Sequence, residues 1–144
     1  MKLEIGTYIL DIDKDVTKNF YKSYYEITKN CNCASCRNYL LAINNFPIEI
    51  KYLFEKLGIE MDKAAEVYIP YKDDNGLLIY DGFYHISGSI LTFQEVFTMI
   101  NIREDFSVGF RNECNLVPKT FPTPVIEMSF RAKLPWLLNE KNTY

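Results

Sequence analysis

Apolar and polar residues alternate most regularly near the end of the chain, over residues 126–134. Successive side chains of a β-strand point to opposite faces of the sheet, so this alternation predicts a strand with one buried face. The residues predicted to be buried are Ile126, Met128, Phe130, Ala132 and Leu134. Those predicted to be exposed are Glu127, Ser129, Arg131 and Lys133. The same period predicts a half-buried strand over residues 106–111.

The middle of the chain has the pattern of a β-hairpin. Two apolar runs, residues 66–71 and 77–80, flank a polar segment that contains Asn75-Gly76. Asparagine followed by glycine adopts the left-handed backbone of tight hairpin turns at little cost, so the two runs are predicted to pair.

The segments after this hairpin are less regular. Asp81-Gly82 predicts a bulge or a second tight turn, and residues 83–91 form a further extended run. Residues 93–100 have no dominant period and fit either a short helix or a loop. Near the N-terminus, apolar residues at alternate positions predict one more strand over residues 2–10.

Helical spacing is confined to the first sixty residues. Val16, Phe20, Tyr24 and Ile27 predict an amphipathic helix over residues 16–28, with Asp15 as its N-cap. A second helix is predicted to begin at Ser35 and to carry Tyr39, Leu40 and Ile43. These two helices flank a short segment rich in cysteine.

A third helix is predicted between Phe46-Pro47 and Gly58. Proline suits the first helical turn, because its missing N–H would have no partner there. The apolar stripe of this helix is Ile50, Leu53, Phe54 and Leu57. Glycine after the last turn accepts the left-handed conformation that ends many helices.

Helices early and hairpin-connected strands late are typical of the α+β class. We predict a single globular domain over residues 1–144, with an antiparallel sheet of about five strands. The N-terminal helices are predicted to pack on one face of this sheet. Neither a linker nor an internal repeat divides the chain.

Composition narrows the function classes. The 144 residues are 48% hydrophobic and 24% charged, with a formal net charge of −3, so the chain lacks the basic field that nucleic acids require. The sequence has neither a signal peptide nor an apolar stretch long enough for a membrane helix. We therefore expect a cytoplasmic protein that binds neither nucleic acid nor membrane.

Three of the four cysteines crowd into one segment, Cys31-Asn32-Cys33-Ala34-Ser35-Cys36. Thiolates are soft ligands for Zn²⁺, which takes four in a tetrahedron, and Cys114 or the lone histidine, His85, could complete the set. The candidate metal ligands are Cys31, Cys33, Cys36 and Cys114. Two other interpretations stay open: the cysteines pack as small apolar residues, or Cys33 and Cys36 form a redox pair.

His85 is the natural candidate for a general base in this chain. Paired with Cys36 or Cys114, it would form a nucleophilic arrangement typical of thiol-dependent enzymes. A histidine bonded to a neighbour on a half-exposed strand is the simpler interpretation. The sequence contains no nucleotide-binding loop, serine elbow or zinc-protease helix, so it offers no positive sign of catalysis.

The segment Cys31–Asn38, together with Gly82-Phe83-Tyr84-His85 and Leu134-Pro135-Trp136, resembles a family of small bacterial proteins of uncharacterised function. The resemblance spans nearly the whole chain, which implies one domain. No activity is known for this family, so the resemblance implies no catalytic or binding residue.

Three functional hypotheses follow. The first is a non-enzymatic cytoplasmic domain that acts through a protein partner and holds a structural zinc ion at the cysteine cluster. The second is a small thiol-dependent enzyme that uses a cysteine with His85. The third is an inhibitor or immunity-type protein, a class that suits a compact acidic chain.

Overall fold

The computed structural model describes residues 1–144 and contains three α-helices, two short 3-10 helices and seven strands. The helices are α1 (Lys14–Ser23), η1 (Ile27–Lys29), α2 (Ala34–Ala42), η2 (Ile43–Asn45) and α3 (Ile48–Leu57). The strands are β1 (Lys2–Ile5), β2 (Tyr8–Ile12), β3 (Glu66–Lys72), β4 (Leu78–Ile90), β5 (Ile100–Arg103), β6 (Phe106–Arg111) and β7 (Val125–Leu134). The α+β class is therefore confirmed.

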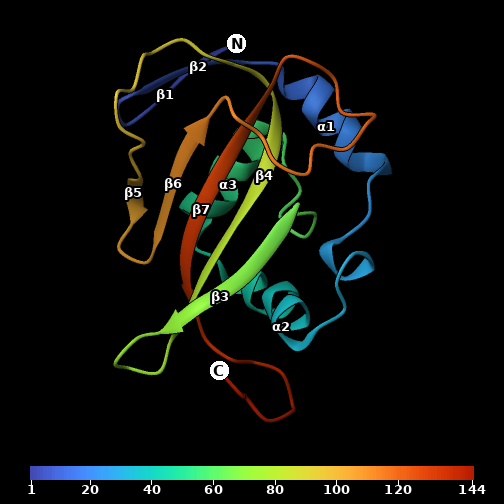
Figure 1. Cartoon of the computed structure of the whole chain (residues 1–144), viewed down its shortest axis with the longest axis vertical. Helices are drawn as coiled ribbons and strands as arrows, with labels where there is room; N and C mark the ends of the chain where they lie inside the picture. Colours follow the sequence, from blue (N-terminus) through green and yellow to red (C-terminus); the bar gives the residue numbers. More distant parts are fainter.

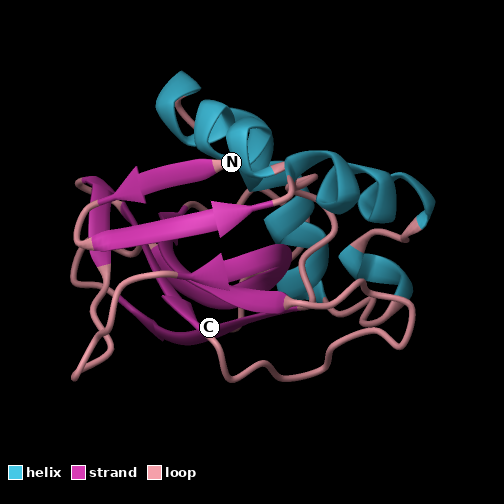
Figure 2. Ribbon diagram, turned by 90° about the horizontal axis from the view of Figure 1, so that it is seen from above, coloured by secondary structure: helices cyan, strands magenta, loops and turns pink.

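All strand pairs are antiparallel, in the order β1-β2-β4-β7-β6-β5, with β3 also paired to β4. The long strand β4 is central: its first half pairs with β3 and its last residues pair with β2, while β7 runs along its other edge. Figure 1 looks onto these strands with α2 and α3 behind them. Figure 2 shows the helices gathered on one side of the sheet.

The prediction of about five strands was too low. The segment predicted as one strand, residues 2–10, is a hairpin that turns at Gly6, where φ is +57°. A Cβ atom on Gly6 would lie 2.6 Å from the Ile100 side chain, so the turn also packs tightly against β5. Strand β5 itself is short and lies in a region where the sequence showed no period. The rest of that region, before Ile100, is a loop, one of its two predicted forms.

The core lies between α2, α3 and one face of the sheet. It is built from aromatic rings: Tyr39 of α2 stacks on Phe130 of β7, and Phe54 of α3 meets Tyr84 of β4 edge to face. The predicted stripe of α3 is confirmed, because Ile50, Leu53, Phe54 and Leu57 are all buried. Gly58 takes the predicted left-handed conformation, with φ of +78°, at the end of this helix.

Helix α1 differs from its prediction because its inward face is polar. Asp13, not Asp15, caps it by accepting the backbone N–H of Val16, and the buried residues are Thr17 and Tyr21. These two side chains make hydrogen bonds to the part of the β4 edge that pairs with neither β2 nor β3. The Tyr21 hydroxyl accepts the His85 N–H and donates to the His85 carbonyl, while Thr17 Oγ1 accepts the Ser87 N–H.

Strand β7 confirms the predicted alternation on its helix-facing side, where Ile126, Met128, Phe130, Ala132 and Leu134 are buried. On the other side, Arg131 and Lys133 are exposed and Ser129 is half-buried. The prediction was wrong for Glu127, whose carboxylate is 3% exposed. That side of the sheet is therefore partly covered, although no helix lies on it.

Strand β4 continues through Asp81 and Gly82, so the predicted turn is absent; the irregularity in its pairing lies in β3, between Tyr68, which pairs with Asp81, and Tyr71. Glycine is required at position 82 by a close approach. A Cβ atom there would lie 2.4 Å from the Glu66 carbonyl oxygen and 2.7 Å from the Phe130 ring.

Candidate metal centre

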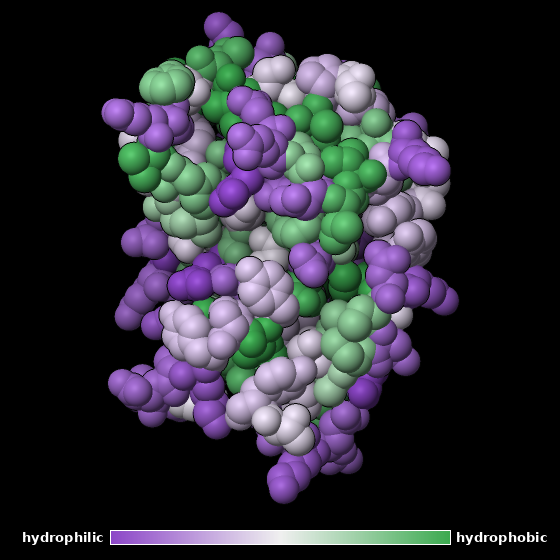
Figure 3. Space-filling view, viewed as in Figure 1, coloured by the Kyte–Doolittle hydropathy of each residue, from purple (hydrophilic) through white to green (hydrophobic).

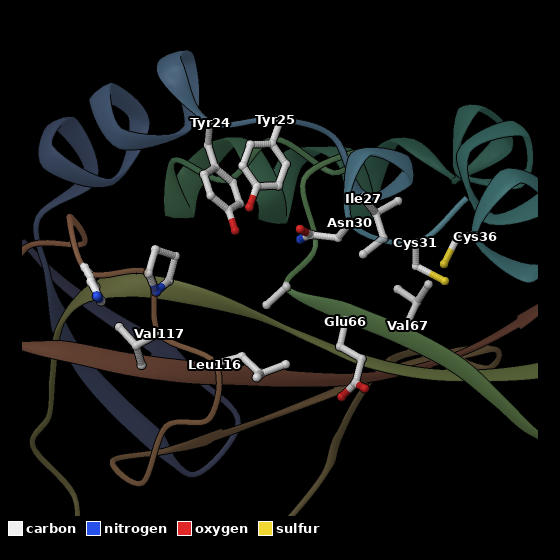
Figure 4. A pocket seen from close by; sticks show the side chains of 13 residues that line it. Tyr24, Tyr25, Ile27, Asn30, Cys31, Cys36, Glu66, Val67, Leu116 and Val117 are labelled. Carbon is white, nitrogen blue, oxygen red and sulfur yellow. The ribbon is translucent and has the colours of Figure 1, made fainter. Parts of the chain in front are cut away.

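Three cysteines converge at the start of α2. The short helix η1 turns the chain so that the Cys31 N–H bonds to the Ile27 carbonyl, and Cys33 is the N-cap residue of α2. The Sγ atoms of Cys31 and Cys33 lie 3.2 Å apart, and those of Cys31, Cys33 and Cys36 all lie within 4.8 Å of one another. Figure 4 shows the thiols of Cys31 and Cys36 side by side.

Contacts from three directions fix α2, and with it these thiols. The Ser35 carbonyl accepts the Tyr80 hydroxyl of β4, and the Asn38 side chain binds backbone groups of Pro135 and Leu137. On the surface, the Arg37 guanidinium donates to both carboxylate oxygens of Glu140, at 2.7 and 3.2 Å. The base of the cysteine cluster is therefore tied to the sheet and to the C-terminal segment.

Cys33 and Cys36 differ in their readiness to ionise. Partial burial opposes ionisation of Cys33, but hydrogen bonds from the Ser35 hydroxyl, the Cys36 backbone N–H and the neighbouring thiols lower its pKa to about 7. Cys36 is buried, and desolvation together with the other two thiols raises its pKa above the ordinary value. One thiolate thus forms near neutral pH at the N-terminus of a helix, where the dipole favours negative charge.

The spacing of the three sulfurs suits a metal ion. Zinc binds thiolates at about 2.3 Å, which places two sulfurs of a tetrahedron roughly 4 Å apart. The observed separations, 3.2 Å for one pair and up to 4.8 Å overall, bracket that value.

Cys114 does not belong to this group, so the predicted four-cysteine set is not assembled. It lies in the loop after β6, where its thiol faces the carbonyl oxygens of Asn112 and Val125, at 3.4 and 3.7 Å. Burial and the Glu127 carboxylate raise the pKa of this thiol. The reason is topological: Cys114 follows β6, which lies beyond β7, whereas the strand that α2 contacts most is β3, at the other edge of β4.

His85 does not pair with a cysteine either. Its side chain points to the face of the sheet that lacks helices, where Nε2 donates to the Asn115 carbonyl at 2.8 Å. Burial lowers the pKa of the imidazole, although the Asn115 carbonyl and Glu127 act in the other direction. The cysteine–histidine contact required by the thiol-enzyme hypothesis is therefore not formed.

An apolar groove of about 620 Å³ adjoins the cysteines. Cys31 and Cys36 form one end of it, and the rings of Tyr24 and Tyr25 lie across from Leu116 and Val117 (Figure 4). Tyr25 and Leu116 are exposed, at 45% and 66%. This groove could not be predicted from local sequence patterns, because Tyr25 and Leu116 on its walls are 91 residues apart in the chain.

Comparison with protein-family models, with curated proteins and with solved structures finds no match to this chain. Among its helices, none has both the length and the apolar character needed to cross a membrane. The function proposed below therefore rests on the side chains of the site itself.

Proposed function

We propose that the protein is a zinc-binding domain that holds one Zn²⁺ through Cys31, Cys33 and Cys36 and works, without catalysis, through a protein partner. The observation that carries this proposal is the convergence of three thiols within 4.8 Å at the start of α2. Three such groups repel one another when ionised, and a bound cation removes that repulsion.

The donor set favours zinc over the common hard cations. Calcium and magnesium take oxygen ligands, whereas thiolates select softer ions such as zinc. The low pKa of Cys33, about 7, supplies one thiolate before any metal arrives. Zinc would then displace the protons of the other two thiols, because ligands must be deprotonated to bind.

Three protein ligands leave one tetrahedral position open. Structural zinc sites are normally closed by four protein ligands, whereas open sites hold water or an external group in the fourth position. The open position here lies next to an apolar groove whose rim includes the exposed side chains of Tyr25 and Leu116. We propose that a segment of the partner lies in this groove and supplies the fourth ligand.

Zinc affinity can be measured by competition with a chromophoric chelator, using metal-free reduced protein. Wild type is expected to bind one zinc ion per chain, and Cys31→Ser, Cys33→Ser and Cys36→Ser to lose most of the affinity. Cys114→Ser is the matched control, because it removes a thiol outside the cluster. No binding by wild type, or equal loss in Cys114→Ser, would contradict the proposal.

The short distance between Cys31 and Cys33 favours a second candidate function, thiol redox chemistry. Their sulfurs are 3.2 Å apart, and a thiolate at Cys33 is the nucleophile that disulfide exchange requires. Oxidation would join these two sulfurs and transfer two electrons and two protons to an added disulfide, which becomes two thiols. Mass spectrometry after incubation with oxidised glutathione tests this: a Cys31–Cys33 disulfide supports redox function, and four intact thiols contradict it.

A further inference from the structure

The side of the sheet without helices carries a second groove, of about 670 Å³, that is lined mainly by polar residues. Phe83 of β4 and Ser129 of β7 occupy paired positions on its floor, whereas Gly109 of β6, the next residue in this row, is covered by Phe97 and Met99. Ser129 is small, so the floor lies below the longer side chains on either side. Figure 3 looks onto this side of the molecule and shows polar and apolar residues intermixed over it.

Two rows of charged residues border the floor. In one, Asp81 of β4 is paired with Arg131 of β7, whose Nε and Nη2 each donate to a carboxylate oxygen at 2.7 Å. In the other, Glu127 of β7 is paired with Arg111 of β6. Glu127 is buried, and its carboxylate accepts the backbone N–H of Asn115 at 3.0 Å. This hydrogen bond fixes the position of the carboxylate.

Arg111 is the one arginine of the four that donates no hydrogen bond. Arg37, Arg103 and Arg131 each donate to a carboxylate. The Arg111 Nε atom is buried without a partner and lies 3.7 Å from the nearest Glu127 oxygen, beyond hydrogen-bonding distance.

The Arg111 guanidinium is nevertheless held in place. It lies over the Phe97 ring, 3.9 Å from the centroid, and the Glu127 charge holds it from the strand side. Stacking on a ring and a nearby carboxylate orient the planar group without using its N–H donors. The Nε donor is buried, but the Arg111 side chain is 41% exposed, and its two Nη groups remain available to a ligand.

We propose that this groove binds a small organic oxyanion, a carboxylate or a phosphate ester, with Arg111 as its bidentate donor. A guanidinium presents parallel N–H groups that match two oxygens of such a group. Because Glu127 offsets the charge of Arg111, recognition depends on the direction of these donors, which favours an oxyanion over a spherical anion such as chloride. Phe83, Phe97 and Met99 line the same groove and offer apolar surface to the rest of the ligand.

Binding can be followed by NMR on isotope-labelled protein titrated with acetate, benzoate, inorganic phosphate or phenyl phosphate, with chloride as the control at equal ionic strength. We expect at least one oxyanion to shift the amides of Ser107 and Ser129, which line the groove, with benzoate or phenyl phosphate binding more tightly than its inorganic or aliphatic counterpart. The two pairs of probes also distinguish a carboxylate ligand from a phosphate ligand.

Three variants test the assignment of Arg111. Arg111→Gln should weaken binding by about tenfold or more, since it removes charge-assisted hydrogen bonds. Arg111→Lys keeps the charge and the aliphatic stem but not the fork, so it should bind with intermediate affinity. Arg103→Gln, which removes an arginine outside the groove, should bind like wild type.

Several results would overturn this inference. They are the absence of groove shifts with all four oxyanions, equal shifts with chloride, and equal losses in Arg111→Gln and Arg103→Gln. The outcome is independent of the zinc proposal, because Cys31, Cys33 and Cys36 do not line this groove.

Discussion

The cysteine cluster and the groove on the helix-free side both gather ionisable side chains, but they balance charge in opposite ways. At the cluster, three acidic groups of the same kind converge, and the nearest arginine, Arg37, is already bound to Glu140. In the groove, each arginine has a carboxylate beside it, Asp81 for Arg131 and Glu127 for Arg111. The cluster could therefore hold a cation from outside the chain, whereas the groove has three carboxylates beside its two arginines, with Glu66 as the third, and offers directed N–H donors.

The largest expected effect follows from the proposed binding of zinc. Zinc at about 1,000 times its dissociation constant should stabilise wild-type protein by up to about 4 kcal/mol, because the folded chain holds the three thiols together and binds zinc more tightly than the unfolded chain does. Denaturant unfolding with and without zinc measures this difference. Cys33→Ser should lose the stabilisation, and Cys114→Ser should keep it. If wild-type protein is equally stable with and without zinc, the proposed difference between the cluster and the groove is wrong.

A medium effect is expected at the edge of β4 that is hydrogen-bonded to helix α1. Tyr21→Phe removes the hydroxyl that bonds both backbone groups of His85, leaving a buried N–H and a buried carbonyl unpaired. We predict a loss of about 1–3 kcal/mol in the free energy of unfolding. Zinc affinity should not change, since the cysteine cluster lies on another element.

Tyr52→Phe is the matched control for this variant, because Tyr52 is 58% exposed and its hydroxyl has no partner within the chain. Its unfolding free energy should stay within about 0.5 kcal/mol of wild type. Equal losses in the two variants would show that the Tyr21 hydroxyl does not support the strand edge.

The smallest effect compares a thiol of the cluster with the thiol beside the groove. The thiolate is the reactive form, so alkylation of Cys33 should rise with pH around its pKa of about 7. The pKa of Cys114 is raised by burial and by Glu127, so its alkylation should begin only at higher pH. Brief iodoacetamide treatment between pH 6 and 10 covers roughly two units either side of an ordinary thiol pKa. Peptide mass spectrometry then gives the extent of alkylation of each cysteine at each pH. Identical profiles would contradict the difference in environment.

Features carried by adjacent residues could be predicted from the sequence. The stripe of α3, its glycine stop and the helix-facing residues of β7 all follow from local period, and the structure confirms them. The closeness of Cys31, Cys33 and Cys36 is also local, because only five peptide bonds separate Cys31 from Cys36. A local pattern needs no knowledge of which strands are neighbours.

Features that depend on strand order could not be predicted in the same way. Glu127 has a polar, outward position in its own strand, and only its pairing with His85 and Arg111 shows why it is buried. The inward face of α1 is polar because Thr17 and Tyr21 bind the unpaired edge of β4, which overrides the apolar stripe predicted from Val16 and Phe20. The position of Cys114 outside the cysteine cluster could not be predicted either, because distance along the sequence does not tell where in the sheet a residue lies.

X-ray absorption spectroscopy at the zinc edge tests the central claim most directly, because it counts the atoms bound to the metal. We expect three sulfurs at about 2.3 Å and one oxygen or nitrogen at about 2.0–2.1 Å, in wild type and in Cys114→Ser alike. Four sulfurs would show that Cys114 or a second chain completes the site. Fewer than three would show that Cys31, Cys33 and Cys36 do not act together as zinc ligands, and either result would contradict the account.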